Sequence, residues 1–110
     1  MAETFKNASL VSVNNSGDAT LYTAPAATTT IVLGVAIANK TASEVTCKLK
    51  FTDTSASTTT ELIPDVSIPG NTTLEVLAGQ KYILETGDII LARAGAASAI
   101  DVTMGILELT

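Results

Sequence analysis

Residues 45–52 read VTCKLKFT, and an apolar side chain alternates with a polar one at every step of this stretch. In an extended chain this alternation places the two sets on opposite sides. The apolar set is Val45, Cys47, Leu49 and Phe51, and the polar set is Thr46, Lys48, Lys50 and Thr52. The stretch therefore predicts a β-strand with one buried and one solvated face, as antiparallel sheets allow.

The preceding run, residues 30–38, is apolar at both phases of a strand. One phase carries the large side chains Ile31, Leu33, Val35 and Ile37, and the other carries the smaller Val32, Gly34, Ala36 and Ala38. We expect both faces of this strand to be covered. The polar segment 39–44 that follows has the composition of a hairpin connection, so we expect the two strands to be antiparallel neighbours.

Short strand-like runs separated by turn residues make up the rest of the chain. They cover residues 9–13, 19–23, 59–63, 66–68, 72–77, 81–84, 88–93 and 99–109. A count of about eight to ten strands predicts an all-β fold, an antiparallel β-sandwich of the jelly-roll kind. The 110 residues suffice for one core, so we expect one β-sandwich domain at 19–110, with 1–18 as an N-terminal strand or arm.

The last run changes its apolar phase near Gly105. Ile100, Val102, Met104 and Ile106 share one phase, whereas Leu107 and Leu109 take the other. A β-bulge near Gly105 would reverse the phase and bring both sets to the core, and we take this as a hypothesis.

The amino-acid composition excludes several common kinds of catalytic and metal site. The chain has 18 Thr, 8 Val and 9 Ile, which suit strands, but no His and one Cys. Common zinc ligand sets, His-based triads and an internal disulfide are therefore excluded, and we predict no catalytic residue, metal or cofactor. Cys47 lies at an apolar phase and is expected to be a buried thiol. The acidic residues lie at polar phases or beside turns, and only Asp53 suggests a weak calcium site.

The charge and the hydropathy of the chain disfavour two classes of partner, nucleic acids and membranes. The net charge of −5 and pI near 4.4 disfavour a nucleic-acid partner, because phosphate binding needs a basic surface. The longest apolar stretch, residues 31–38, is about half the length of a membrane-spanning helix, and the N-terminus does not resemble a secretory signal. We therefore expect no membrane partner and synthesis in the cytoplasm.

Apolar residues make up 46% of the chain and charged residues 15%, which is more apolar surface than one small core absorbs. We expect a partner to cover the excess at short side chains that allow close backbone approach. The candidates are Val32, Gly34, Ala36, Ala38, Ala92, Ala94, Ala96 and Ala97. The alternative interpretation is that these small residues fit the second sheet of the same sandwich.

The order of turns and strands over residues 19–110 resembles that of small structural proteins encoded by tailed bacteriophages, including bacteriophages of cyanobacteria. The matching stretches are 21–29, the long apolar strand that ends at 38–39, 45–52, 68–77, 80–88 and 99–103, whereas residues 4–18 do not match. The resemblance implies a non-enzymatic virion component that is made in the host cytoplasm and works as a homo-oligomer, with a trimer as one candidate. Its expected contacts are other copies and virion proteins such as the major capsid protein.

We therefore expect a capsid decoration or cement protein that stabilises the head. A tail, neck or fibre component is the alternative within this class. A carbohydrate- or calcium-binding module is the alternative from another class. The scarcity of aromatic side chains, 4% of the chain without any Trp, disfavours the sugar-binding version.

Overall fold

Nine strands form in the computed structural model, which describes residues 2–76 and 82–110. The strands are β1 (Glu3–Leu10), β2 (Ala19–Thr23), β3 (Thr29–Asn39), β4 (Val45–Asp53), β5 (Thr58–Ile68), β6 (Thr73–Val76), β7 (Tyr82–Leu84), β8 (Ile89–Ala94) and β9 (Ile100–Leu109). No helix occurs within these described ranges. Consequently no described helix is long and apolar enough to cross a membrane.

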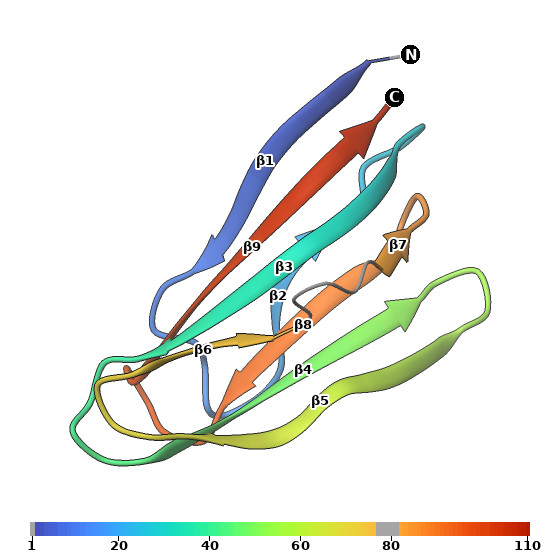
Figure 1. Cartoon of the computed structure of the whole chain (residues 1–110). Coiled ribbons are helices and arrows are strands. Elements are labelled where there is room, and N and C mark those ends of the chain that lie inside the picture. The colour runs from blue at the N-terminus through green and yellow to red at the C-terminus, as the bar shows by residue number, and fades with distance from the viewer. Residues whose placement is uncertain (1, 77–81) are drawn as a thin grey trace.

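The strands form two antiparallel sheets (Figure 1). Sheet A has the order β1-β9-β3-β6, with β7 also paired to β3, and sheet B has the order β2-β8-β4-β5. The pairing is nested: β1 pairs with β9, β2 with β8, β3 with β6 and β7, and β4 with β5. If β6 and β7 are counted as one interrupted strand, this is a jelly roll, a long hairpin rolled into two sheets.

The core lies between the two sheets and is built from alternate residues of their strands. Sheet A contributes fully buried side chains such as Ile37, Met104 and Ile106, and sheet B contributes Leu49 and Ile90. The phase predicted for residues 45–52 is confirmed at Val45, Cys47 and Leu49, which are buried. The all-β sandwich predicted from the sequence is thus the observed fold.

The first predicted strand, residues 9–13, was misplaced. Strand β1 spans Glu3–Leu10 and pairs with β9 along its whole length. Most of its side chains are exposed, so apolar alternation gives no signal there, and backbone hydrogen bonds hold it in place. Whether residues 1–18 also act as an arm remains a prediction. The predicted runs 59–63 and 66–68 form one strand, β5, because an edge strand with bulges tolerates Pro64.

The predicted hairpin between residues 30–38 and 45–52 was wrong. Strand β3 belongs to sheet A and β4 to sheet B, so residues 40–44 cross from one sheet to the other. Polar composition does not distinguish a hairpin from such a crossover. The Asn39 side chain fixes the crossing: its Nδ2 donates to the carbonyls of Ser43 and Ile68, and its Oδ1 accepts from the Thr41 N–H.

The bulge hypothesis for Gly105 was also wrong. Strand β9 pairs with β1 without a break through Gly105, and its buried residues keep one phase from Ile100 to Glu108. The bulge lies instead in β3, where Leu33 is the extra residue between the Val32–Ile106 and Gly34–Gly105 pairs. It reverses the phase of β3, which places Val32 and Val35 on the same, inner face.

The predicted strand ends at Leu77 and Lys81, and the predicted turn between them, lie outside the described residues.

Candidate functional site

The eight predicted interface residues fall into three groups. Val32, Ala92 and Ala94 are 1%, 1% and 3% exposed, so their side chains belong to the chain's own core and offer no surface to a partner. The alternative interpretation holds for these three, because they face the other sheet. The others remain partner-contact predictions: Gly34, Ala36 and Ala38 on the outer face of sheet A, and Ala96 and Ala97 after β8.

A row of apolar side chains crosses the outer face of sheet A. Phe5 of β1 is paired with Leu107 of β9, which is paired with Ile31 of β3, which is paired with Ile83 of β7. Leu33 projects beside this row from the bulge, and Leu109 lies one step further along β9. We call these six residues the apolar patch.

The apolar patch is open to solvent. Phe5 is 73% exposed, Ile83 is 61% exposed and Leu33 is 37% exposed. These are three of the four large apolar side chains that are exposed in the described part of the chain, and Val11 is the fourth. Clustering of this kind on one face marks an interaction surface, whereas scattered apolar residues would not.

A polar cluster lies on the inner face behind the apolar patch. Glu108 points between the sheets with a side chain that is 8% exposed, and its carboxylate accepts from Lys6 Nζ at 2.9 Å and from the Tyr22 hydroxyl at 2.5 Å. Thr30 Oγ1 lies 2.8 Å from the same Tyr22 oxygen. The Tyr22 hydrogen bond, followed by Lys6, lowers the pKa of Glu108, and burial, with help from Glu108, raises that of Tyr22 to about 12. At this end of the sandwich, sheet A therefore has a polar cluster beside its apolar core on the inside and an apolar patch on the outside.

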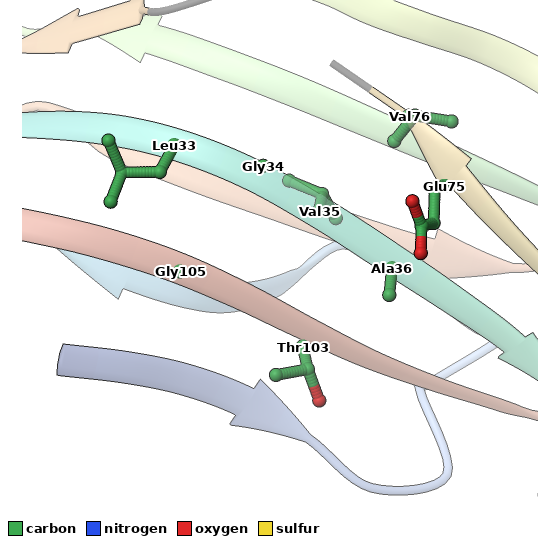
Figure 2. Close-up of a pocket in the computed structure, with 8 residues that line it drawn as sticks. All are labelled: Leu33, Gly34, Val35, Ala36, Glu75, Val76, Thr103 and Gly105. Atoms are coloured by element: carbon green, nitrogen blue, oxygen red, sulfur yellow. The ribbon is translucent and has the colours of Figure 1, made fainter. Parts of the chain in front are cut away.

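A groove lies on the same outer face, next to the apolar patch (Figure 2). Its volume is about 390 Å³, and its floor is the Gly34–Gly105 pair of neighbouring strands. Leu33, Ala36, Glu75 and Thr103 are among the residues around it. A shallower hollow of about 200 Å³ continues from Leu33 and Gly105 toward Phe5 and Asn7. We call the larger hollow the glycine groove.

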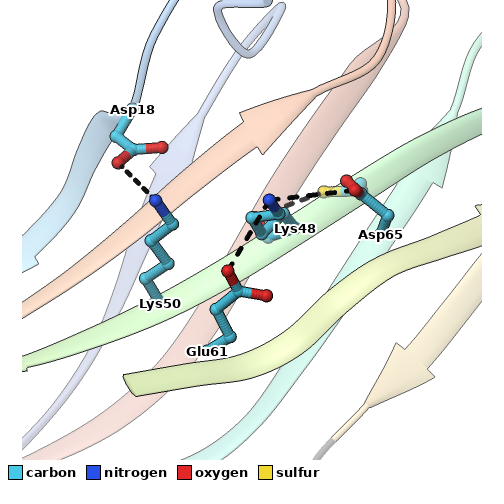
Figure 3. A network of polar contacts seen from close by, with 6 residues as sticks. Asp18, Lys48, Lys50, Glu61 and Asp65 are labelled. Atoms are coloured by element: carbon cyan, nitrogen blue, oxygen red, sulfur yellow. Dashed lines mark hydrogen bonds and ion pairs between the residues drawn. The ribbon is translucent and has the colours of Figure 1, made fainter. Parts of the chain in front are cut away.

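The outer face of sheet B has a different character, because charged pairs cover it (Figure 3). Lys50 Nζ lies 3.0 Å from Asp18 Oδ2, and Lys48 Nζ lies 3.8 Å from Glu61 and 3.7 Å from Asp65. Arg93 stands opposite Lys48 on β8. This is an ordinary solvated sheet face with partly exposed ion pairs.

The candidate chemical groups have structural roles. Burial raises the pKa of the Cys47 thiol to about 11. The thiol is therefore protonated and unreactive at neutral pH. Asp53 Oδ1 accepts from Ser55 Oγ and the Ala56 N–H within its own turn. Within residues 2–76 and 82–110, no group of three His, Cys, Asp or Glu side chains is placed to hold a metal ion.

Two other acids fix connections. The Asp101 carboxylate accepts from the Ser12 N–H and from Lys40, and these contacts lower its pKa. Asp88, which is buried, accepts from the Thr54 and Glu85 N–H groups. Both acids therefore stabilise the connections between strands.

The sequence interpretation missed the apolar patch, although a signal was present. Leu107 and Leu109 were assigned to the core, because a bulge near Gly105 would reverse their phase. The polar residue between them, Glu108, marks the inner phase instead. Apolar residues flanking a charged one at the end of a regular alternation would have indicated an apolar outer face.

No protein-family model matches the chain, and no curated protein matches its sequence. Solved structures do match its fold. A chain from the acid-stable capsid of Helicobacter pylori bacteriophage KHP30 matches over 99% of this chain and 89% of its own length, with 14% identity and a TM-score of 0.62. A chain from the disulfide-linked pili of Bacillus endospore appendages matches over 98% and 88%, with 8% identity and a TM-score of 0.58.

A pentameric capsid protein from metagenomic phage sequences is a weaker match. It covers 94% of this chain and 59% of its own length, with 19% identity and a TM-score of 0.41, which is too low to support an argument. The two stronger likenesses, at 14% and 8% identity, show the fold: this chain has the β-sandwich found in a phage capsid chain and in a pilus chain.

Proposed function

We propose that this chain is a non-enzymatic structural protein of a bacteriophage virion that decorates the capsid as a homo-oligomer. The apolar patch carries the proposal, because its exposed side chains lie in register across four strands of one face. Exposed apolar side chains in this arrangement do not stabilise a single folded chain. A neighbouring subunit that covers the patch removes it from water.

The energetics support a contact surface of this kind. Burial of one Phe or Ile side chain contributes about 1.5–3 kcal/mol, so covering Phe5 and Ile83 alone would favour association. The net charge of −5 also suits a part that lies outside packaged DNA, since it disfavours binding to phosphates. The shared fold with a chain of the KHP30 capsid supports a place on the phage head.

A fibre-forming component, in the tail or another appendage, is the second candidate. It is favoured by the match to the endospore pilus chain, which covers 98% of this chain. The two candidates differ in the assembly that they require. A decoration protein forms closed oligomers on a shell, whereas a fibre subunit forms open polymers.

The first test measures association by analytical ultracentrifugation, with the double variant Phe5→Ser, Ile83→Ser. Both side chains are mostly exposed, so the fold should survive their replacement, and circular dichroism checks this. We expect the wild type to associate and the double variant to sediment as a monomer. Val11→Ser is the matched control, because Val11 is 75% exposed and lies outside the patch.

The second test uses capsid shells from the phage that encodes the chain, prepared after deletion of its gene. The wild type and the Val11→Ser control should pellet with the shells, and the double variant should not. Regular filaments in electron micrographs of the purified protein would favour the fibre candidate. A wild-type chain that stays monomeric and ignores both shells and tails would overturn the proposal.

A further inference from the structure

The glycine groove is not explained by the chain's own structure. A Cβ atom on Gly34 would meet no atom within 4 Å, and one on Gly105 would approach only Asn7 Oδ1, at 3.8 Å. Neither glycine has a positive φ, in contrast to Gly87. Glycine in a strand lowers stability relative to alanine, and its usual reasons are a bulge or a close approach from outside. The bulge at Leu33 adjoins this pair, and the open space above both glycines leaves room for a close approach from outside.

The chemistry of the glycine groove defines what fits it. Its floor is backbone, and Leu33 and Ala36 add apolar surface. At its edge the Glu75 carboxylate makes no hydrogen bond or ion pair with the described residues, and Thr103 carries a hydroxyl (Figure 2). A long side chain with an apolar stem and a cationic head matches this combination.

This chain carries such a side chain on its opposite face. Among the described cations, the four lysines have acid partners: Lys6 with Glu108, Lys40 with Asp101, Lys48 with Glu61 and Asp65, and Lys50 with Asp18. Arg93 has none within the part of the chain that the structure describes, and it is exposed on the outer face of sheet B. Its direct neighbour across the sheet is Lys48, a like charge, which disfavours it in the isolated chain.

We propose that Arg93 of one copy enters the glycine groove of a second copy and pairs with Glu75 there. The inference rests on the homo-oligomer of the proposed function and specifies its contact. Because the two residues lie on opposite outer faces, the contact is head to tail and repeats from copy to copy, giving a ring where it closes and a filament where it does not.

The charge distribution favours this contact over a symmetric one. Joining the outer faces of two A sheets would bring two Glu75 carboxylates together. Among the described cations, those of β1 and of the end of β3, Lys6 and Lys40, are already paired with Glu108 and Asp101. Joining the outer face of sheet A to that of sheet B places an unpaired acid beside an unpaired base.

Charge reversal tests the contact. Glu75→Arg and Arg93→Glu should each weaken association at least about tenfold, since each places like charges in the interface. An equimolar mixture of the two variants should associate again, because the reversed charge at position 75 of one variant faces the reversed charge at position 93 of the other. Sedimentation velocity measures all three samples, and circular dichroism confirms that each variant is folded.

Glu44→Arg is the control, because Glu44 is exposed in the loop after β3 and changes the net charge as Glu75→Arg does. It should associate as the wild type does. Single reversals that associate normally, or a mixture that stays dissociated, would overturn the Glu75–Arg93 contact. If the wild type is a monomer, the proposed oligomer itself fails. If reversal has no effect but Phe5→Ser, Ile83→Ser dissociates the oligomer, only this contact fails.

Discussion

The outer faces of the two sheets differ, although both sheets enclose the same core. On sheet B, Lys48 and Lys50 are paired with acids from β5 and from the connection before β2. On sheet A, the apolar patch is exposed, and Glu75 has no partner among the described residues. The comparison teaches that sheet A carries the exposed apolar surface, whereas the outer face of sheet B carries charged pairs and one cation, Arg93, without an acid partner among the described residues.

The difference arises from the end of β9, where alternation continues but polarity is inverted. Glu108 takes the inner position, and Leu107 and Leu109 take the outer ones. The buried carboxylate is tolerated because Lys6 and Tyr22 satisfy it, as buried charges require. At the end of β9 the apolar outer positions therefore flank an inner position that is polar and fully satisfied.

Core substitutions should have the largest effect on stability, and they test whether the two sheets share one core. Ile37→Ala in sheet A and Leu49→Ala in sheet B each remove a side chain that is 0% exposed. Each should lower the free energy of unfolding by about 2–5 kcal/mol, measured by chemical denaturation. Ile83→Ala on the outer face should cost less than about 1 kcal/mol in the monomer. A large loss at only one of the two core positions would contradict a shared core.

Alkaline pH should produce the next largest effect, because two groups with raised pKa values lie between the sheets. The pKa of Cys47 is raised from 9.0 to about 11, so its stabilising contribution is present below pH 9 and lost between pH 9 and 11. For this fully buried thiol the loss corresponds to about 2–3 kcal/mol. Tyr22, raised from 10.0 to about 12, acts in the same direction over pH 10–12.

Unfolding curves at pH 7, 9, 10 and 11 measure this loss. Cys47→Ala should flatten the decline between pH 9 and 11, and Tyr22→Phe should flatten its upper part. A stability that is constant from pH 7 to pH 11 in the wild type would show that these groups are not buried as described.

The fold was largely predictable because alternation reports burial directly. The alternation at residues 45–52 predicted β4 to within one residue, and residues 19–23 are β2 itself. The strand order was not predictable, because the crossover at residues 40–44 and a hairpin have the same polar composition. Strand β1 was misplaced because its side chains are exposed on both faces.

The candidate site was less predictable. Gly34, Ala36 and Ala38 lie on the outer face and stay predicted partner contacts, whereas Val32 is buried, because one extra residue at Leu33 reverses the phase. A bulge leaves no mark in a run where every residue is apolar. The Phe5–Leu107–Ile31–Ile83 row depends on the register between strands far apart in sequence, which composition does not encode.

Gly34→Ala should have a smaller effect, and it should stabilise the monomer while it weakens association. The added Cβ has free space, so the monomer should gain up to about 1 kcal/mol, because alanine loses less conformational entropy than glycine on folding. The same methyl group enters the glycine groove and should weaken association several-fold. Gly70→Ala is the contrast, because its Cβ would collide with the Ala42 backbone and should destabilise the monomer. Unchanged association in folded Gly34→Ala would argue against an occupied groove.

The smallest effect is expected at the charged pairs on the outer face of sheet B. Lys50 and Asp18 have side chains that are 23% and 30% exposed, so solvent screens their attraction. Lys50→Ala, Asp18→Ala and the double variant form a thermodynamic cycle whose coupling energy should be about 0.2–1 kcal/mol and should shrink at 1 M salt. A coupling above about 2 kcal/mol would mean that solvent does not screen this pair as described and would weaken the contrast between the two outer faces.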